Sequence, residues 1–185
     1  LCDQIGLYVI DEVNLETHGT WMAMGQYVPS ENVLPNDHAV WKGAVQRRTE
    51  DMFYRDRNHP SILLWSLGNE CCGGSILLGM ANLLRSLDST RLIHYEGIFW
   101  DRHFPETSDV ESRMYAKPQE IRNYLATNPP KPYLSCEYAH AMGNSLGGLQ
   151  EYVALEDEFA QYQGGFIWDF KDQTLRVKKG DGQPE

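Results

Sequence analysis

Two glutamates stand directly after short apolar runs, among side chains that suit chemistry on a polar substrate. Glu70 ends the stretch WSLGNE, and Glu137 ends LSCE and is followed by YAHAMGNS. Amide, aromatic and imidazole groups surround both acids, and such groups hydrogen-bond to sugar hydroxyls and stack on sugar rings. Each glutamate taken alone is equally compatible with an ordinary loop acid. The elements that hold the two acids therefore decide what they mean.

Short apolar runs alternate with helical patterns along the chain. The runs cover residues 6–12, 62–67, 92–96, 112–116, 132–138 and 164–170. Between them, apolar residues recur at helical spacing around residues 41–53, 76–87 and 149–159. We expect six strands, mostly buried on both faces, in successive parallel βα units. At this level a doubly wound sheet and a (β/α) barrel both remain open.

Polar and aromatic side chains at the strand ends favour the barrel. They are Glu12, Glu16, Asn69, Glu70, Glu96, Tyr115, Glu137, Trp168 and Asp169. A (β/α)8 barrel gathers the carboxyl ends of all its strands around one mouth, whereas no glycine-rich phosphate loop of the doubly wound type follows any strand here. The predicted fold is α/β, a (β/α)8 TIM barrel. Since such barrels need eight strands and about 250 residues, we expect residues 1–185 to be a partial barrel domain, with two strands encoded before Leu1.

Two carboxylates at the ends of different inner strands are what retaining glycoside hydrolysis requires. One acid protonates the leaving oxygen, and the other attacks the anomeric carbon to form a covalent glycosyl-enzyme. Glu70 and Glu137 are the candidates for these two roles.

Composition excludes some classes of partner. The 185 residues include 16 Lys and Arg against 26 Asp and Glu, a net charge of −10, so neither a nucleic acid nor a membrane surface is an expected partner. No apolar stretch reaches the roughly 18 residues of a membrane span, and no signal peptide opens the chain. The four cysteines lack a metal-finger spacing, which favours free thiols in a reducing, cytoplasmic compartment.

Four longer stretches carry a family resemblance. They are DEVNLETHG (11–19), NHPSILLWSLGNE (58–70), SCEYAHAMGNS (135–145) and QGGFIWDFKDQTL (163–175). In this order they resemble the central barrel of the large β-galactosidases of glycoside hydrolase family 2, over nearly the whole chain. The resemblance implies a (β/α)8 barrel of which this chain supplies the third to eighth strands.

The resemblance also implies roles for single residues. Glu70 is similar to the family's general acid/base at the end of the fourth strand, and Glu137 to its nucleophile at the end of the seventh. Asn69 matches an asparagine that hydrogen-bonds the sugar 2-hydroxyl, a contact that strengthens as charge develops in the transition state.

Four further residues match the family's sugar contacts. Met114 and Tyr115 correspond to the MYA motif after the sixth strand, where the tyrosine orients the nucleophile. His140 corresponds to a histidine that contacts galactose hydroxyls, and Trp168 to the aromatic floor under the sugar.

A metal site is implied by ETHG, in which the family's glutamate and histidine bind Mg²⁺ together with the acid/base. Here these residues are Glu16, His18 and Glu70. Spacing alone would make Glu16 and His18 a loop acid and a capping histidine. The ligands of the family's monovalent cation, Na⁺ or K⁺, lie mostly outside this chain.

The sequence departs from the family after the acid/base, where Cys71 and Cys72 replace a serine and glycines. The remaining histidines match no family role, and we expect them to be structural or at the surface; they are His38, His59, His94 and His103. Residues 98–113 carry none of the matched motifs, and in a barrel such βα loops shape the leaving-group side of the pocket, which leaves the leaving-group preference open.

The favoured function is a retaining β-galactosidase acting on lactose-like substrates, with a homo-oligomeric parent enzyme. A β-glucuronidase or β-mannosidase on the same barrel is the alternative, although ETHG and CEYAHAMGNS favour the galactosidase. A non-catalytic sugar-binding module would be expected to lose one of the two acids, and both are present.

Overall fold

The computed structural model describes residues 1–22, 32–143, 146–169 and 171. The chain forms two compact units, and each is described by itself. The first contains Leu1–Arg113 and Pro130–Leu134, and the second contains Met114–Pro129 and Ser135–Glu185. Two three-stranded sheets are present among the described residues, in the orders β1-β2-β3 and β4-β5-β6.

The first sheet is parallel and consists of β1 (Val9–Glu12), β2 (Ile62–Ser66) and β3 (Leu92–His94). Its register places Glu12 opposite Ser66, and Ser66 opposite His94. Because side chains alternate between the faces of a strand, these three point to one face. Trp65, the neighbour of Ser66, points to the other face.

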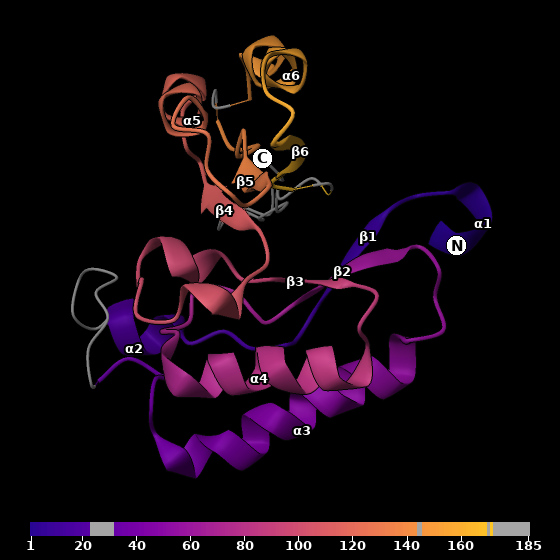
Figure 1. Cartoon of the computed structure of the whole chain (residues 1–185), viewed down its shortest axis with the longest axis vertical. Helices are drawn as coiled ribbons and strands as arrows, with labels where there is room; N and C mark the ends of the chain where they lie inside the picture. Colours follow the sequence, from indigo (N-terminus) through magenta and orange to yellow (C-terminus); the bar gives the residue numbers. More distant parts are fainter. Residues whose placement is uncertain (23–31, 144–145, 170, 172–185) are drawn as a thin grey trace, which may run out of the picture. The chain divides into compact units, whose positions relative to one another are not determined.

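Two helices cover the Trp65 face of this sheet and lie side by side, α3 (Ala39–Asp56) and α4 (Gly74–Leu87) (Figure 1). Each buries residues three or four apart, the spacing of an amphipathic helix. The buried residues include Val45, Met52 and Phe53 on α3, and Leu77, Met80 and Leu84 on α4. The Phe53 ring meets Trp65 edge-on at 5.6 Å between centroids, so helix and sheet share one apolar core.

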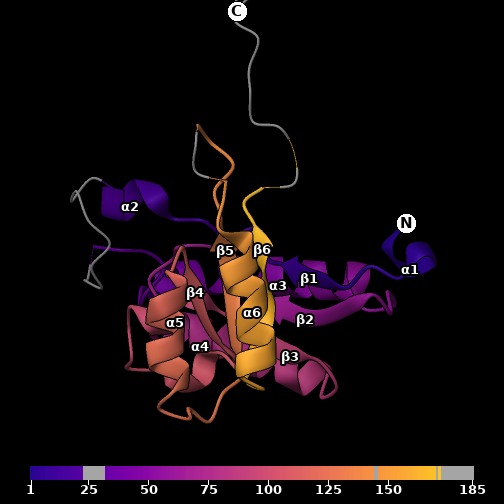
Figure 2. The ribbon, with the colours of Figure 1, turned by 90° about the horizontal axis from the view of Figure 1, so that it is seen from above.

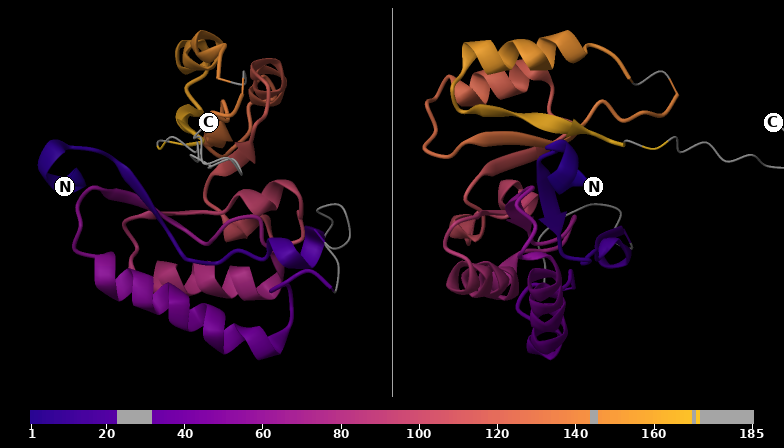
Figure 3. Two further views of the ribbon diagram at one scale, coloured as in Figure 1. Left: turned by 180° about the vertical axis from the view of Figure 1, so that it is seen from behind. Right: turned by 90° about the vertical axis from the view of Figure 1, so that its right-hand side faces the viewer.

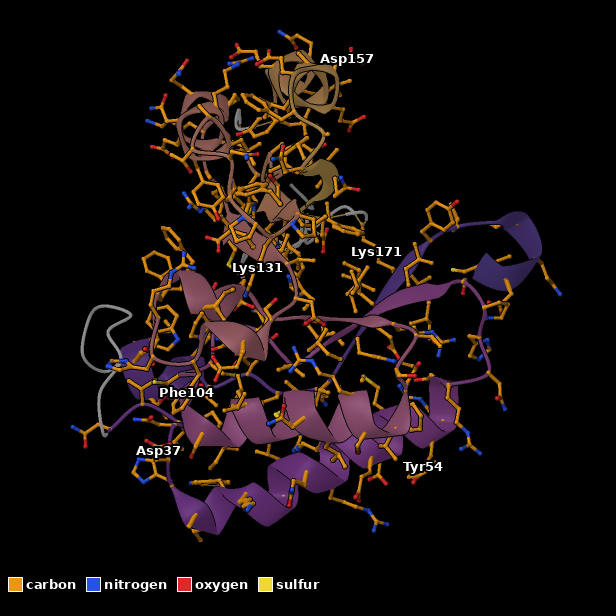
Figure 4. The ribbon with its side chains drawn as sticks, in the orientation of Figure 1. Asp37, Tyr54, Phe104, Lys131, Asp157 and Lys171 are labelled. Atoms are coloured by element: carbon orange, nitrogen blue, oxygen red, sulfur yellow. The ribbon has the colours of Figure 1, made fainter. Side chains whose placement is uncertain are left out.

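A carboxylate ties the start of α4 to the segment before α3. Asp37 lies next to the amino end of α3 (Figure 4) and accepts hydrogen bonds from the Ser75 backbone N–H at 2.7 Å and from its hydroxyl. These bonds lower the pKa of Asp37. An acid at a helix amino end satisfies an N–H that the helix leaves open.

Four short elements complete the first unit. They are α1 (Cys2–Ile5), α2 (His18–Met22), and the 3₁₀ turns η1 (Glu96–Phe99) and η2 (Pro105–Thr107). α2 follows β1 and η1 follows β3, so both lie at the carboxyl ends of strands.

The second unit holds the ends of β4 (Glu111–Met114) and β5 (Tyr133–Tyr138), and β6 (Tyr162–Ile167). Helices α5 (Pro118–Leu125) and α6 (Leu149–Glu158) run side by side over these strands (Figures 2 and 3). Arg122 on α5 donates to both carboxylate oxygens of Glu158 on α6, at 2.7 and 2.9 Å.

All six predicted strands are confirmed, with bounds shifted by a few residues. The prediction that they are mostly buried on both faces is wrong for β1, which has no buried residue, and for β6, where only Tyr162 is buried. Each of these strands is terminal in its sheet, and a terminal strand has a neighbour on one side only. No helix in the described part of the chain is long and apolar enough to cross a membrane.

Candidate active site

The turn after β2 positions Asn69 and Glu70. Gly68, in this turn, has φ +136°, and a Cβ there would stand 2.6 Å from the Leu15 carbonyl oxygen. The close approach lets the Asn69 N–H donate to the same carbonyl at 2.9 Å. The backbone of Asn69 also forms an isolated parallel β-bridge with that of Glu16. The segments after β1 and β2 are thereby held together, which brings Glu16 close to the turn.

The Glu70 peptide is held from both sides. The backbone of Glu70 is left-handed, with φ +48°. Its N–H donates to Glu96 Oε1 at 2.7 Å, and its carbonyl accepts from Trp21 Nε1 at 3.0 Å. The Glu70 side chain is 27% exposed, so the carboxylate is open to a substrate while its backbone is fixed.

His18 lies between the two glutamates of the predicted metal site, Glu16 and Glu70. Its Nε2 lies 3.1 Å from Glu70 Oε2, and its Nδ1 lies 3.4 Å from Glu16 Oε2. The structure therefore brings Glu16, His18 and Glu70 together. Two carboxylates and an imidazole are a donor set that a hard divalent cation accepts, so the residues present fit such an ion. As arranged, the two carboxylates contact the imidazole, and the described residues contain no group of three converging on one metal position.

Glu96 is the buried acid of this region. Its side chain follows β3 at the start of η1 and is 2% exposed. Burial raises the pKa of Glu96 to about 8, with backbone hydrogen bonds opposing and the charges of Glu12 and Glu70 adding to the shift. Glu96 stood among the predicted strand-end residues but was given no role. Only the fold shows that its carboxylate reaches the backbone of Glu70.

The two cysteines after Glu70 are absorbed into the core. Cys71 and Cys72 are both fully buried, and the Cys71 thiol lies 3.3 Å from the carbonyls of Leu15 and Asn69. Burial raises the pKa of Cys71 to about 12, so its reactive thiolate form is scarce. The two cysteines are therefore packing residues of the core next to Glu70.

Glu137 lies near the carboxyl end of β5 and is paired with Tyr115, the residue that follows β4. The Tyr115 hydroxyl donates to Glu137 Oε2, and the Tyr115 N–H donates to the Glu137 carbonyl at 2.7 Å. Tyr115 has φ +53°, a conformation that turns its ring back toward β5. Met114, half-buried, ends β4 beside it.

His140 and Trp168 follow β5 and β6 on the same unit. The His140 ring is tilted against that of Tyr115 at 5.7 Å between centroids. The Trp168 N–H donates to the Tyr138 carbonyl at 3.1 Å, and the Trp168 carbonyl accepts from Ala141 N–H at 2.7 Å. Trp168 is 41% exposed, which leaves it available as a stacking surface.

Comparison with known proteins identifies the family. The model of glycosyl hydrolases family 2, TIM barrel domain, matches residues 1–184. The chain belongs to glycosyl hydrolase family 2. It is 55% identical over 183 residues to a β-galactosidase of Halalkalibacterium halodurans, covering 99% of this chain and 18% of that protein. It is 52% identical over 178 residues to a β-galactosidase large subunit of Leuconostoc lactis, covering 95% and 28% respectively. The chain thus spans about a fifth to a quarter of the length of these relatives.

Solved structures agree on the fold. The crystal structure of a Bacteroides uniformis β-glucuronidase superposes with a TM-score of 0.65 at 17% identity, over 91% of this chain and 24% of that one. At this identity the likeness concerns the fold alone. Together with the family match, it establishes the TIM-barrel fold that the strand-end residues predicted.

The two units divide the predicted site residues of this family 2 barrel. Asn69 and Glu70, with Glu16 and His18, lie in the first unit. The second unit holds the remaining set, which consists of Met114, Tyr115, Glu137, His140 and Trp168. The residues that the sequence did not identify are Glu96 and Trp21, which bind the backbone of Glu70. The sequence marked Glu96 as an acid at a strand end, whereas no local pattern marked Trp21.

Proposed function

We propose that this chain is the catalytic part of a retaining β-galactosidase that hydrolyses terminal β-D-galactosyl residues of lactose-like substrates. In this proposal it supplies the third to eighth strands of the barrel. The observation that carries the proposal is the placement of two glutamates at the carboxyl ends of β2 and β5, each fixed by neighbours, Glu70 through its backbone and Glu137 through Tyr115. The β-galactosidases at 52–55% identity support the choice of substrate.

In the proposed reaction Glu137 attacks the anomeric carbon while Glu70 protonates the departing oxygen. The hydroxyl of Tyr115 donates to the attacking carboxylate and fixes its direction. Glu70 then removes a proton from the water that hydrolyses the glycosyl-enzyme. Asn69 would hydrogen-bond the 2-hydroxyl, His140 other galactose hydroxyls, and Trp168 would stack under the apolar face of the sugar.

We also propose that Glu16, His18 and Glu70 hold Mg²⁺, which when bound would supply positive charge beside the acid/base. Their donor set supports this, as do the contacts of His18 with both acids. Equilibrium dialysis of the full-length enzyme should show Mg²⁺ binding that weakens in Glu16→Gln. Equal binding by both proteins would show that Glu16 is not a ligand.

We also propose that the parent enzyme is oligomeric. The relative named a β-galactosidase large subunit supports this.

The roles of the two acids can be separated in the full-length enzyme by replacing each with alanine and supplying azide with an activated aryl β-galactoside. Without Glu137 no glycosyl-enzyme forms, so azide attacks the anomeric carbon directly and should give the α-galactosyl azide. Without Glu70 the glycosyl-enzyme still forms when the leaving group needs no proton. Azide then attacks that intermediate and should give the β-azide.

Nuclear magnetic resonance distinguishes the two anomers. Exchanged products would mean that the nucleophile and the acid/base are reversed. Full activity in both variants would show that neither Glu70 nor Glu137 is catalytic. Hydrolysis of an aryl β-glucuronide in preference to the galactoside would replace the proposed substrate.

A further inference from the structure

The peptide of Glu70 adopts a conformation that a glutamate does not adopt unaided. Its φ of +48° lies in the left-handed region, where a non-glycine residue is strained and persists only when its surroundings fix it. Gly68, two residues before Glu70, allows the close approach of the chain to Leu15. The left-handed turn at Glu70 itself must be held by other contacts.

Those contacts come from two separate segments of the first unit, helix α2 and the segment after β3. Glu96, after β3, accepts the Glu70 N–H at 2.7 Å, and Trp21, on α2, donates to the Glu70 carbonyl at 3.0 Å. One residue further on, the Tyr95 hydroxyl donates to the Cys71 carbonyl. The hydrogen-bonding groups of the Glu70 peptide and of the next carbonyl are thus bound by side chains that are distant in sequence.

The acceptor on Glu96 is itself held in place. Glu96 is buried, and its neighbour Tyr95 is 1% exposed. The Tyr95 ring folds back over the next residue but one, so closely that a Cβ on Gly97 would lie 2.0 Å from the Tyr95 hydroxyl oxygen. The Tyr95 N–H donates to Ser108 Oγ at 3.0 Å. The carboxylate of Glu96 therefore has little freedom to leave the Glu70 N–H.

We propose that Glu96 and Trp21 are positioning residues for the acid/base. They clamp the Glu70 peptide in its left-handed conformation and so aim the Glu70 carboxyl at the departing oxygen. This inference rests on the proposed function, because it takes Glu70 to be the proton donor. Neither clamp residue is placed in contact with the sugar.

The placement of Glu96 favours this role over simple packing. A buried carboxyl group is costly compared with an apolar side chain of the same size even when it is neutral, so packing alone gives no reason for an acid at this position. Its Oε1 instead accepts the backbone N–H of Glu70. A rotation of that peptide would change the direction of the Glu70 side chain. Proton transfer needs heavy atoms within hydrogen-bond reach, and a shift of about 1 Å in a catalytic group costs about 100-fold in rate.

The test uses the full-length enzyme and two aryl β-galactosides, one whose leaving group needs protonation and one whose leaving group does not. Glu96→Leu removes the acceptor at similar volume, and Glu96→Gln keeps an acceptor oxygen. We expect Glu96→Leu to lower kcat/KM about tenfold or more on the first substrate only. Glu96→Gln should retain most of the rate on both, since a conservative variant rescues a positioning role.

Trp21→Phe provides a second variant, because it removes the indole N–H donor and keeps an aromatic ring. It should show the same selectivity between the two substrates. The control is Trp41→Phe, which replaces an exposed tryptophan on α3 and should leave the rates on both substrates unchanged. If Glu96→Leu fails to fold, Trp21→Phe decides the question. No loss, or an equal loss on both substrates, overturns the clamp.

Glu70→Gln separates the two levels of the proposal. If it loses activity selectively on the substrate that needs a proton while the clamp variants do not, the inference fails and the proposed function stands. If Glu70→Gln shows no such selectivity, the assignment of Glu70 as the acid/base fails first.

Discussion

Left-handed backbone recurs at the residues around the two acids. Glu70, Tyr115 and Ala139 have φ values of +48°, +53° and +47°, and each such residue costs on the order of 1–3 kcal/mol. Backbone strain of this kind is concentrated at functional sites and persists only where the surrounding structure fixes the conformation. The hydrogen bonds that hold these peptides run to other elements, so the strain at each acid depends on the fold around it.

The hydroxyl of Tyr115 gives the sharpest test at the residue scale. Tyr115→Phe removes the donor to Glu137 Oε2 but keeps the backbone bond at 2.7 Å. We expect kcat to fall at least about 100-fold, as when one donor aimed at a reacting oxygen is removed. Steady-state rates on a nitrophenyl β-galactoside measure this. Tyr152→Phe, whose hydroxyl donates to the Ala116 carbonyl, is the control and should keep its rate.

Single residues also show what the sequence could predict. The motif resemblance predicted that Tyr115 orients Glu137, and the structure shows the hydrogen bond between them. The catalytic roles of Glu70 and Glu137 stay predictions. Trp21 and Glu96 were not identified, since their partner Glu70 lies 49 and 26 positions away. A hydrogen bond between distant segments leaves no local pattern that composition or spacing could show.

At the scale of elements, the turn after β2 depends on a glycine. Gly68→Ala places a methyl group 2.6 Å from the Leu15 carbonyl oxygen at a φ of +136°. We expect it to lower the free energy of unfolding by about 3 kcal/mol, the scale of overpacking and strain together. Urea unfolding of the full-length enzyme measures the change.

Gly43→Ala is the matched control for Gly68→Ala. Gly43 lies on α3, where nothing stands within 4 Å of a new Cβ, so alanine should stabilise the helix by about 0.5–1 kcal/mol. Equal midpoints for the two alanine variants would contradict the account of the turn.

The elements were predictable where burial made them apolar. β2 and the helices α3 and α4 carry the core, and their apolar spacing marked them. Helix α5 was missed because it is short and mostly polar. In the structure Pro118 is the first residue of the helix, and the Glu120 carboxylate caps it by accepting the Lys117 N–H at 2.9 Å. Proline suits this first position, since its missing N–H is not needed there.

At the scale of the molecule, a row of polar side chains crosses the first sheet and predicts acid sensitivity. Glu12 accepts from Ser66 at 2.6 Å, Ser66 contacts His94 Nδ1 at 2.8 Å, and His94 Nε2 contacts Ser112 at 2.9 Å. Burial lowers the pKa of His94 to about 4. The row lies within the first unit, where it links three strands of the sheet to β4.

The sign of the effect follows from the proton uptake of each state. An unfolded histidine titrates near 6.5, so below that pH the unfolded chain binds a proton that the folded chain rejects. Stability from neutral His94 is full above pH 6.5 and falls by roughly 2 kcal/mol by pH 5. Urea midpoints at pH 8 and pH 5 should therefore fall further for the wild type than for His94→Gln. Equal falls would show that His94 is not the sensitive group.

The open edges of the terminal strands predict how the isolated chain behaves in solution. β1 and β6 are each terminal in their sheets, and large apolar side chains beside or on them are exposed, among them Tyr8 at 79% and Phe166 at 44%. An open strand edge with apolar side chains pairs with other chains, whereas a closed barrel has no edge. We expect the isolated 185-residue chain to aggregate and to leave a nitrophenyl β-galactoside intact. Light scattering and the assay, with the full-length enzyme as control, measure this.

A charge on each edge separates the two effects in this experiment. Tyr8→Lys with Phe166→Lys should reduce aggregation, because an edge lysine disfavours strand pairing. It should not restore activity, since the proposed site needs a closed barrel of eight strands, and the described residues contain six. A monomeric wild-type chain that hydrolyses the galactoside at the full-length rate would show that these residues form a complete site. A charged variant that aggregates as readily as the wild type would place the cause of association elsewhere on the surface.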